Sequence, residues 1–229
     1  MGDGDGVVKT PVMLCGARPG LEERVVQRRK RLLDVDKILD GALTVIDKHG
    51  RLTMTELAAQ LGTSASSVYH HVSGRAAIVE LLRERVVAAA MEVPPLDGTD
   101  WVDQIARWMH SYRAALAQHP NLIPLLTEHT MTAGGVLRGY DRVAQLLRGA
   151  GVDAREVLLW ISAFDSYALG AALDLAAPDD VWRRSVDDLP ALDEALSAAP
   201  RGRRRADESF AIGLRALLVG LRERLSGGA

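Results

Sequence analysis

Cysteine is almost absent from this sequence, which has 229 residues and a single cysteine, Cys15. One cysteine cannot form a disulfide within the chain, so the class of small disulfide-stapled secreted domains is excluded. No run of about 18 uncharged apolar residues is present, and none of the sequence therefore predicts a transmembrane helix. The first residues carry acids where a secretory signal peptide has positive charge. These absences predict a cytoplasmic protein with no membrane partner.

The residue patterns of the common enzyme classes are missing as well. There is no glycine-rich phosphate loop, no nucleophile elbow and no cluster with metal-ligand spacing. His70 and His71 are adjacent, so on a helix they would point about 100° apart and could not share one metal ion. The other histidines are scattered along the chain. The sequence therefore predicts neither an enzyme, nor a metal site, nor a required cofactor.

The residues that are abundant favour an all-α fold. Hydrophobic residues make up 48% of the chain and aromatic residues only 4%, and alanine, leucine and arginine are good helix formers. Between Arg24 and Ala90 the chain has 11 Lys and Arg against 7 Asp and Glu, although its overall net charge is −2. A basic N-terminal third on an acidic remainder is expected where one part of a protein meets nucleic acid.

The chain is expected to begin with a flexible basic extension over residues 1–30. Its first 20 residues are rich in glycine, and the run from Arg24 to Arg31 is strongly basic. Such a run could neutralise DNA phosphates, or it could be a solvated helix start. A helix from Val35 to Lys48 should follow and end at Gly50. Its apolar stripe has helical spacing and comprises Val35, Ile38, Leu39, Ala42, Leu43 and Ile46.

The stretch from Leu52 to Arg75 has the pattern of two short helices joined by a tight turn. Thr53 and Glu56 have the spacing of a capping box, in which Glu56 reaches back to the Thr53 N–H. Gly62 can take the left-handed conformation that ends a helix, and Ser64 can cap the next one.

The second helix of this pair, predicted over Ala65–Val72, has only two core anchors, Val68 and Val72. Its other side chains are short hydroxyls followed by flat rings, which suits a helix that lies in a major groove. The sequence thus favours a helix-turn-helix. A surface hairpin in another all-α protein is the alternative.

These residues resemble the DNA-binding domain of the tetracycline-repressor (TetR) family. The matching features are the helix from Val35, the T-x-x-E-L-A-x-x-L-G run over 53–62, the S-x-V-Y-H-H-V run over 66–72, and Arg75. The resemblance implies a helix-turn-helix domain over 31–75 and a C-terminal ligand-binding domain over 76–229 that dimerises. A helix over about 75–91 would link them. The implied DNA-binding residues are Thr53, Thr55, Ala65, Ser66, Ser67, Tyr69, His70, His71 and Arg75.

Beyond the motif the chain again has helical periodicity. The linking helix should turn a face inward that comprises Ile78, Leu81, Leu82, Arg85 and Val86, with Arg85 at its edge. Two prolines within Val93–Gly98 mark the clearest boundary. Caps at Asp100 and Asp153 predict helices to about Gln118 and Ala177, and a third is predicted over Val136–Gly149. A polar helix over Asp179–Ser197, a solvated arginine-rich loop over 199–205 and a last helix over Glu208–Leu225 complete the expectation.

The helix from Asp153 is apolar nearly all round, so it should be buried on several sides. In the TetR family it would pair with the last helix in a homodimer. Polar groups embedded in these apolar helices indicate a site for a small hydrophobic or aromatic effector of unknown identity. The candidates are Trp108, His110, Tyr112, His129, Thr132, Tyr140, Trp160, Asp165 and Asp174. His129, Thr132 and Asp174 also resemble the tetracycline-binding subclass, where an acidic residue lies near a metal-bound drug.

The function that these patterns predict is that of a TetR-like transcriptional repressor. It would bind a palindromic, double-stranded DNA operator as a dimer and be released by a small-molecule effector. The alternative is an effector-independent helix-turn-helix protein whose C-terminal bundle binds a protein partner. An all-α enzyme is the third and least favoured class.

Overall fold

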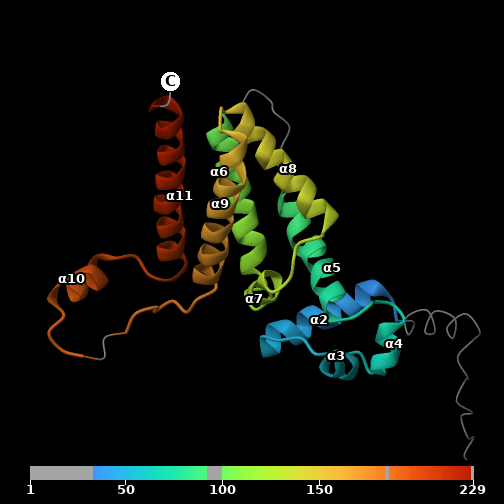
Figure 1. Ribbon diagram of the computed structural model, residues 1–229. Coiled ribbons are helices and arrows are strands. Elements are labelled where there is room, and N and C mark those ends of the chain that lie inside the picture. The colour runs from blue at the N-terminus through green and yellow to red at the C-terminus, as the bar shows by residue number, and fades with distance from the viewer. Residues whose placement is uncertain (1–32, 92–99, 184–185, 228–229) are drawn as a thin grey trace, which may run out of the picture. The chain divides into compact units, whose positions relative to one another are not determined.

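The computed structural model describes residues 33–91, 100–183 and 186–227 (Figure 1). Within these ranges every regular element is a helix, which confirms the all-α prediction. The predicted basic extension over 1–30 and the proline-rich boundary at 93–98 lie outside the described residues.

Three helices form the helix-turn-helix part, namely α2 (Val35–His49), α3 (Met54–Gln60) and α4 (Ala65–Tyr69). Helix α2 ends at Gly50 as predicted, where the backbone is left-handed with φ of 66°. Its buried stripe begins one turn later than predicted, because Val35 is exposed. The apolar side chains buried in this part of the chain are Ile38, Leu39, Ala42, Val45, Ile46, Leu52, Leu57, Ala58, Val68 and Val72.

The turn between α3 and α4 follows the prediction closely. The N–H of Gly62 bonds to the carbonyl of Ala59, and the N–H of Thr63 bonds to that of Ala58. This is a Schellman motif, and Gly62 supplies its left-handed residue with φ of 63°. The side chain of Ser64 then accepts the Ser67 N–H at 3.2 Å and begins α4.

Helix α4 is shorter than predicted. It ends at Tyr69, and His70 and His71 lie in the turn that follows rather than on the helix. Val72, the second predicted core anchor, is nevertheless buried. It therefore packs into the core from the turn after α4 and not from the helix itself.

Helix α5 (Arg75–Val87) continues into a 3-10 turn, η1 (Ala88–Met91). Its predicted inner face was wrong at Leu81 and Val86, whereas Arg85 was predicted at the edge of that face. Leu81 and Arg85 are exposed and Val86 is half-buried. The residues that α5 buries are Ile78, Val79, Leu82, Arg83 and Val87. Arg85 instead binds Asp40 of α2 at 2.6 Å, so it ties α5 to the helix-turn-helix.

Three helices follow, α6 (Trp101–Ala117), α7 (Leu122–Thr127) and α8 (Gly134–Gly149). Asp100 caps α6 through the Val102 N–H at 3.1 Å, as predicted. Helix α8 begins two residues before the predicted Val136.

Helix α8 crosses η1 at very short range. A Cβ built on Gly139 would lie 2.4 Å from the Cβ of Met91, so no larger residue fits there without displacing one of the two elements. Any shift of α8 is therefore passed directly to the end of α5.

Helix α9 (Ala154–Leu175) is capped by Asp153, as predicted. It packs against α6, α8 and α11. By length and mean hydropathy α9 could also cross a membrane, a test that core helices of globular proteins pass as well. No transmembrane segment was predicted from the sequence, because it has no run of about 18 uncharged apolar residues.

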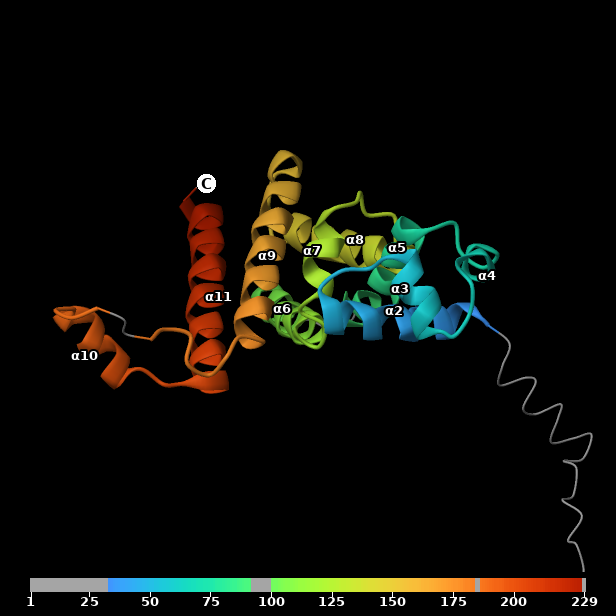
Figure 2. The same ribbon diagram turned by 90° about the horizontal axis from the view of Figure 1, so that it is seen from below.

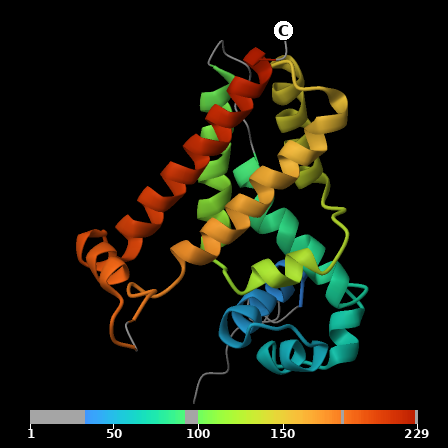
Figure 3. The same ribbon diagram turned by 60° about the vertical axis from the view of Figure 1, so that its left-hand side comes forward.

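Two predictions for the C-terminal segment were wrong. Helix α10 covers only Pro190–Ala198, whereas the polar helix was predicted from Asp179. None of its residues is buried, and Figures 1 and 2 show it apart from the other helices. Helix α11 begins at Gly202, inside the predicted arginine-rich loop, and runs to Gly227 beside α9 in the opposite direction (Figure 3).

The arginines of that predicted loop are not all solvated. The Arg205 guanidinium donates both Nη1 and Nη2 to the Asp174 carboxylate, at 3.0 and 2.9 Å. This bidentate pair joins the end of α9 to the first turn of α11 and explains why the helix begins early.

Candidate nucleic-acid interface and effector site

The predicted DNA-binding side chains lie on the surface of the helix-turn-helix. Tyr69 is 53% exposed although its neighbour Val68 is fully buried. Six of the nine are exposed, namely Thr53, Thr55, Ser66, Tyr69, His70 and His71, and three are half-buried, namely Ala65, Ser67 and Arg75. A short helix with one buried anchor and exposed hydroxyls and rings can approach another surface closely.

The hydroxyls of Thr53 and Ser67 already form hydrogen bonds within the helix-turn-helix. The Thr53 hydroxyl accepts the Glu56 N–H at 3.2 Å and donates to the Glu56 carboxylate at 2.7 Å. The capping box thus differs from the prediction, because Glu56 binds the hydroxyl of Thr53 and the guanidinium of Arg51. The Arg51 and Thr53 contacts lower the pKa of Glu56 below its ordinary value. Ser67 likewise shares a 2.9 Å hydrogen bond with Ser64.

Arg75, at the start of α5, has a partner outside the helix-turn-helix. Its guanidinium binds the carboxylate of Glu128 at 2.7 Å, and both side chains remain partly exposed. Glu128 directly follows α7, 53 residues further along the chain. This pair could not be predicted from the sequence, because no local pattern joins residues that lie 53 positions apart.

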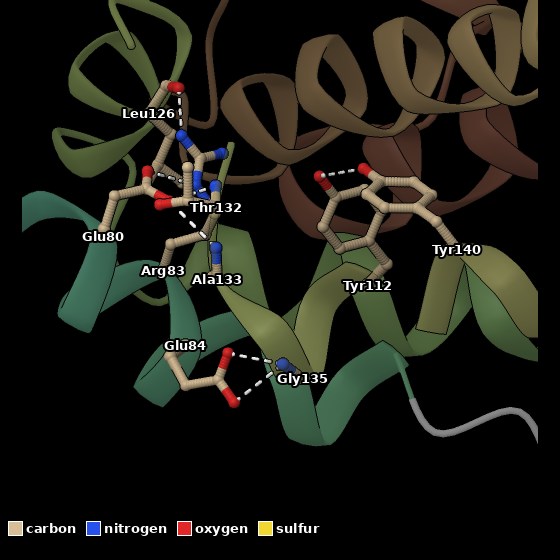
Figure 4. A network of polar contacts seen from close by, with 9 residues as sticks. All are labelled: Glu80, Arg83, Glu84, Tyr112, Leu126, Thr132, Ala133, Gly135 and Tyr140. Atoms are coloured by element: carbon tan, nitrogen blue, oxygen red, sulfur yellow. Dashed lines mark hydrogen bonds and ion pairs between the residues drawn. The ribbon is translucent and has the colours of Figure 1, made fainter. Parts of the chain in front are cut away.

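A polar network fixes α5 against the segment between α7 and α8 (Figure 4). It is built by three residues of α5, Glu80, Arg83 and Glu84, called the α5 clamp below. Arg83 donates to the carbonyl of Leu126 at 2.5 Å and to Glu80 at 2.9 Å. Arg83 is buried, and a buried charge is costly unless it is paired. The Glu80 carboxylate and the Leu126 carbonyl compensate it.

The two glutamates of the α5 clamp hold backbone N–H groups. Glu80 accepts the N–H groups of Thr132 and Ala133 at 2.7 and 3.1 Å. Glu84 accepts the N–H of Gly135, in the first turn of α8, at 2.8 and 3.0 Å. Burial alone raises the pKa of Glu80, but the Thr132 N–H and Arg83 outweigh it, so its pKa lies below the ordinary value.

Four of the predicted effector residues come together between α6, α8 and α9. The hydroxyls of Tyr112 and Tyr140 both donate to Oδ1 of Asp165, at 2.7 and 2.6 Å. Trp108 stacks on Tyr112 with ring centroids 5.9 Å apart and meets Tyr140 edge-on at 6.3 Å. Tyr112, Tyr140 and Asp165 are called the tyrosine–aspartate cluster below.

The chemistry of this cluster is set by its surroundings. Burial raises the pKa of both tyrosines above the ordinary value; for Tyr112 the neighbouring Tyr140 and then Asp165 raise it further, and for Tyr140 the charge of Asp165 does. Both phenols consequently stay protonated and act as hydrogen-bond donors.

A hollow of about 430 Å³ opens beside this cluster, between α8 and α9. This α8–α9 hollow is lined by Met131, Leu137, Tyr140, Asp141, Ala144, Leu158, Ile161, Ser162 and Asp165. Its volume lies in the range of small-molecule sites, and its walls are mostly apolar with a few polar groups.

The other predicted effector residues lie elsewhere. His110 packs edge-on against Phe210 and lines a groove between α6 and α11. His129 and Thr132 line a hollow against α5, and Asp174 is held by Arg205. The ring of Trp160 lies beside that of Phe164, with centroids 6.1 Å apart, and Trp160 does not line the α8–α9 hollow. Among the described residues, no group of three His, Cys, Asp or Glu side chains could hold a metal ion.

Comparison with known proteins decides the family. The model of the tetracycline repressor-like C-terminal domain matches residues 94–225. A helix-turn-helix transcriptional regulator of Saccharopolyspora erythraea is 30% identical over 68% of this chain and 65% of its own length. The chain belongs to the TetR family.

Two further comparisons cover more of the chain. The class E tetracycline repressor of Escherichia coli is 28% identical to this TetR-family chain over 84% of it and 92% of that repressor. The solved structure of ActR from Streptomyces coelicolor in complex with actinorhodin has the same fold, with a TM-score of 0.66 at 22% identity. That match covers 82% of this chain and 95% of ActR. This chain spans only 65% of the S. erythraea relative's length, so the partners of that whole protein do not transfer directly.

The family model matches the half of the chain where the sequence motifs were weaker. The motifs that resemble TetR-family DNA-binding domains lie before residue 76, whereas the family model matches residues 94–225.

Proposed function

We propose that this TetR-family chain is a dimeric repressor whose helix-turn-helix binds a palindromic DNA operator. The observation that carries the proposal is helix α4, capped by Ser64 and anchored by Val68, which leaves Ser66 and Tyr69 free for contact. Hydroxyls and rings of this kind donate to phosphates and base edges in the major groove. A regulator that binds such an operator would act in the cytoplasm, and no cofactor or catalytic role is part of the proposal.

The dimer is proposed from the exposed apolar side chains of α9 and α11. Leu159 is 68% exposed and Ile212 is 70% exposed, and Leu173 and Val219 on the same two helices are exposed as well. Large apolar residues that gather on one surface indicate an interface. A two-fold dimer would present two copies of α4 to the two halves of a palindromic operator.

The effector would bind in the α8–α9 hollow and act through α8. Tyr140 of α8 donates to Asp165, and one residue earlier Gly139 packs against Met91 at the end of α5. The α5 clamp holds the first turn of α8 as well. An effector that moves Tyr140 would therefore shift α5 and, with it, the spacing of the two α4 helices.

Such a shift releases DNA only if the effector prefers the altered spacing. The coupling free energy equals the difference in its affinity for the two states. The presence of the α8–α9 hollow favours a small-molecule effector over the alternative of a protein partner on the bundle.

Selection of tight-binding sequences from random double-stranded DNA tests the proposal. The expected result is an enriched site with two-fold symmetry, whose halves are separated by about one helical turn. Enrichment of a single unsymmetrical half-site, or of no sequence at all, would contradict the operator and its dimeric reader.

A further inference from the structure

We propose that the effector of this protein carries a positively charged amine on an apolar or aromatic frame. The proposal rests on the proposed effector site and names the class of ligand that the α8–α9 hollow selects. Its basis is the distribution of charge along the walls of that hollow.

The charged groups that line the hollow are both acidic. They are Asp141, on the exposed side of α8, and Asp165, within α9. Among the described residues that line it, there is no lysine, arginine or histidine. A carboxylate ligand would meet two like charges there, whereas an ammonium group would meet two opposite ones.

Asp165 is the group that would bind the amine. Its Oδ1 takes both phenol hydrogen bonds, and no cation pairs with Asp165 in the described part of the chain. Asp141, by contrast, already accepts the Gln145 side-chain amide at 2.7 Å. A half-buried carboxylate without a counter-ion gains more from a cationic ligand than an exposed one does.

The protein also holds this carboxylate in place. Tyr112 is fixed from behind by the stacked ring of Trp108, and Tyr140 is fixed by the close crossing of α8 and η1. The nearby charge of Arg83 is already committed to Glu80 and the Leu126 carbonyl. Asp165 is thus a preorganised anion, and preorganisation increases the affinity for a complementary charge.

The remaining walls define the rest of the ligand. Leu137, Leu158 and Ile161 present aliphatic surface, which would bury a ring system or hydrocarbon chain attached to the amine. The ring of Tyr140 offers an aromatic surface to the same cation. The ligand class is therefore an amphiphilic amine rather than a small hydrophilic cation.

Three probes with one frame test the charge preference. They are 2-(2-naphthyl)ethylamine, 2-(2-naphthyl)ethanol and 2-naphthylacetate, titrated into the full chain by calorimetry. The amine should bind at least about tenfold more tightly than the alcohol, which corresponds to about 1.4 kcal/mol, and the acid should bind least. Equal or tighter binding of the alcohol or the acid would overturn the proposal, as would no binding of any probe.

Two variants place the amine in the hollow. Asp165→Asn should weaken binding of the amine about tenfold and leave the alcohol unchanged. Asp103→Asn, an exposed position on α6, is the matched control for net charge and should change neither. Leu158→Trp narrows the hollow from its exposed rim without touching Asp165, and should weaken the amine even if Asp165→Asn does not fold. Unchanged amine binding in Asp165→Asn and Leu158→Trp would overturn the assignment.

Operator binding measured on the same preparations separates this proposal from the proposed function. A chain that binds its operator but prefers the alcohol or the acid has the proposed function with another class of effector. A chain that binds the amine at Asp165 but no specific DNA supports the ligand class and contradicts the regulator.

Discussion

At the level of single side chains, Glu128 and a DNA phosphate would compete for the guanidinium of Arg75. The guanidinium of Arg75 cannot pair with Glu128 at 2.7 Å and also clamp a DNA phosphate with the same donors. Glu128 follows Leu126, whose carbonyl the α5 clamp holds, so its position depends on the C-terminal helices. A carboxylate of the effector-binding part thus restrains a residue of the predicted DNA interface.

We predict that Glu128→Gln tightens operator binding by about two- to fivefold at low salt. An exposed ion pair contributes up to about 1 kcal/mol, and removal of this pair frees Arg75 for phosphate. Measurement by fluorescence anisotropy should show that the gain shrinks as salt is raised, because salt screens exposed charges.

Two controls make this prediction specific. Glu223→Gln removes one exposed carboxylate of α11 and should leave operator affinity unchanged. In an Arg75→Ala background, which should itself weaken all DNA sequences alike and lower the salt slope by about 1, Glu128→Gln should have no effect. An equal gain from Glu128→Gln and Glu223→Gln would show that net charge, not this ion pair, is responsible.

At the level of elements, the α5 clamp makes stability depend on pH. The pKa of Glu80 lies below its ordinary value in the folded protein. Its carboxylate therefore stabilises the fold fully above the unfolded pKa of about 4.5, and this contribution is lost as the pH falls through the lower folded value.

We predict that Glu80→Gln lowers the free energy of unfolding by about 2 kcal/mol at pH 7, because half-buried, charge-assisted hydrogen bonds to Arg83, Thr132 and Ala133 are lost. Urea unfolding at a series of pH values should show a smaller decrease between about pH 5 and 3 for the variant than for the wild type. Glu194→Gln on the exposed helix α10 serves as the control. Parallel pH curves for wild type and Glu80→Gln would argue against the role of this carboxylate.

Helix boundaries were predicted well where local signals set them. The caps at Asp100 and Asp153 and the glycine at 62 act within one turn, so the sequence alone displays them. The start of α11 could not be predicted this way, because it depends on Arg205 and Asp174, which lie 31 residues apart. The inner face of α5 was missed because Arg83, a residue expected at the surface, is buried by its partners.

The candidate site was predicted as a set of residue types rather than as an arrangement. Tyr112, Tyr140 and Asp165 were singled out as polar groups in apolar helices, and they do meet. That both phenols share one carboxylate oxygen depends on how three helices pack, which no spacing within one helix reveals. His110 and Asp174 fitted the same sequence criterion but lie in other surroundings.

At the level of the whole molecule, the proposed dimer requires that the exposed faces of α9 and α11 become buried. We predict that Ile212→Asp converts the dimer into monomers at micromolar concentration, because an unpaired charge would be buried in an apolar interface. Its dissociation constant should rise by about 100-fold or more, which corresponds to about 2.8 kcal/mol, measured by analytical ultracentrifugation.

The matched control for this variant is Val35→Asp, at an exposed position on α2 outside the proposed interface. It should leave the sedimentation coefficient of the dimer unchanged. A dimer that survives Ile212→Asp with unaltered affinity would contradict the assignment of the interface to α9 and α11. Operator affinity should fall together with dimerisation, because two half-sites need two joined copies of α4.

The central claim, that α4 reads an operator, is tested most directly by titrating the protein against the DNA immediately upstream of its own gene. The titration would be run at several salt concentrations, with Tyr69→Ala beside the wild type, since Tyr69 is exposed and its loss should not unfold the chain. The account predicts tight binding that falls steeply with salt, exceeds binding to random DNA, and is lost in Tyr69→Ala although its melting temperature is unchanged. Specific binding that persists undiminished in Tyr69→Ala would contradict it.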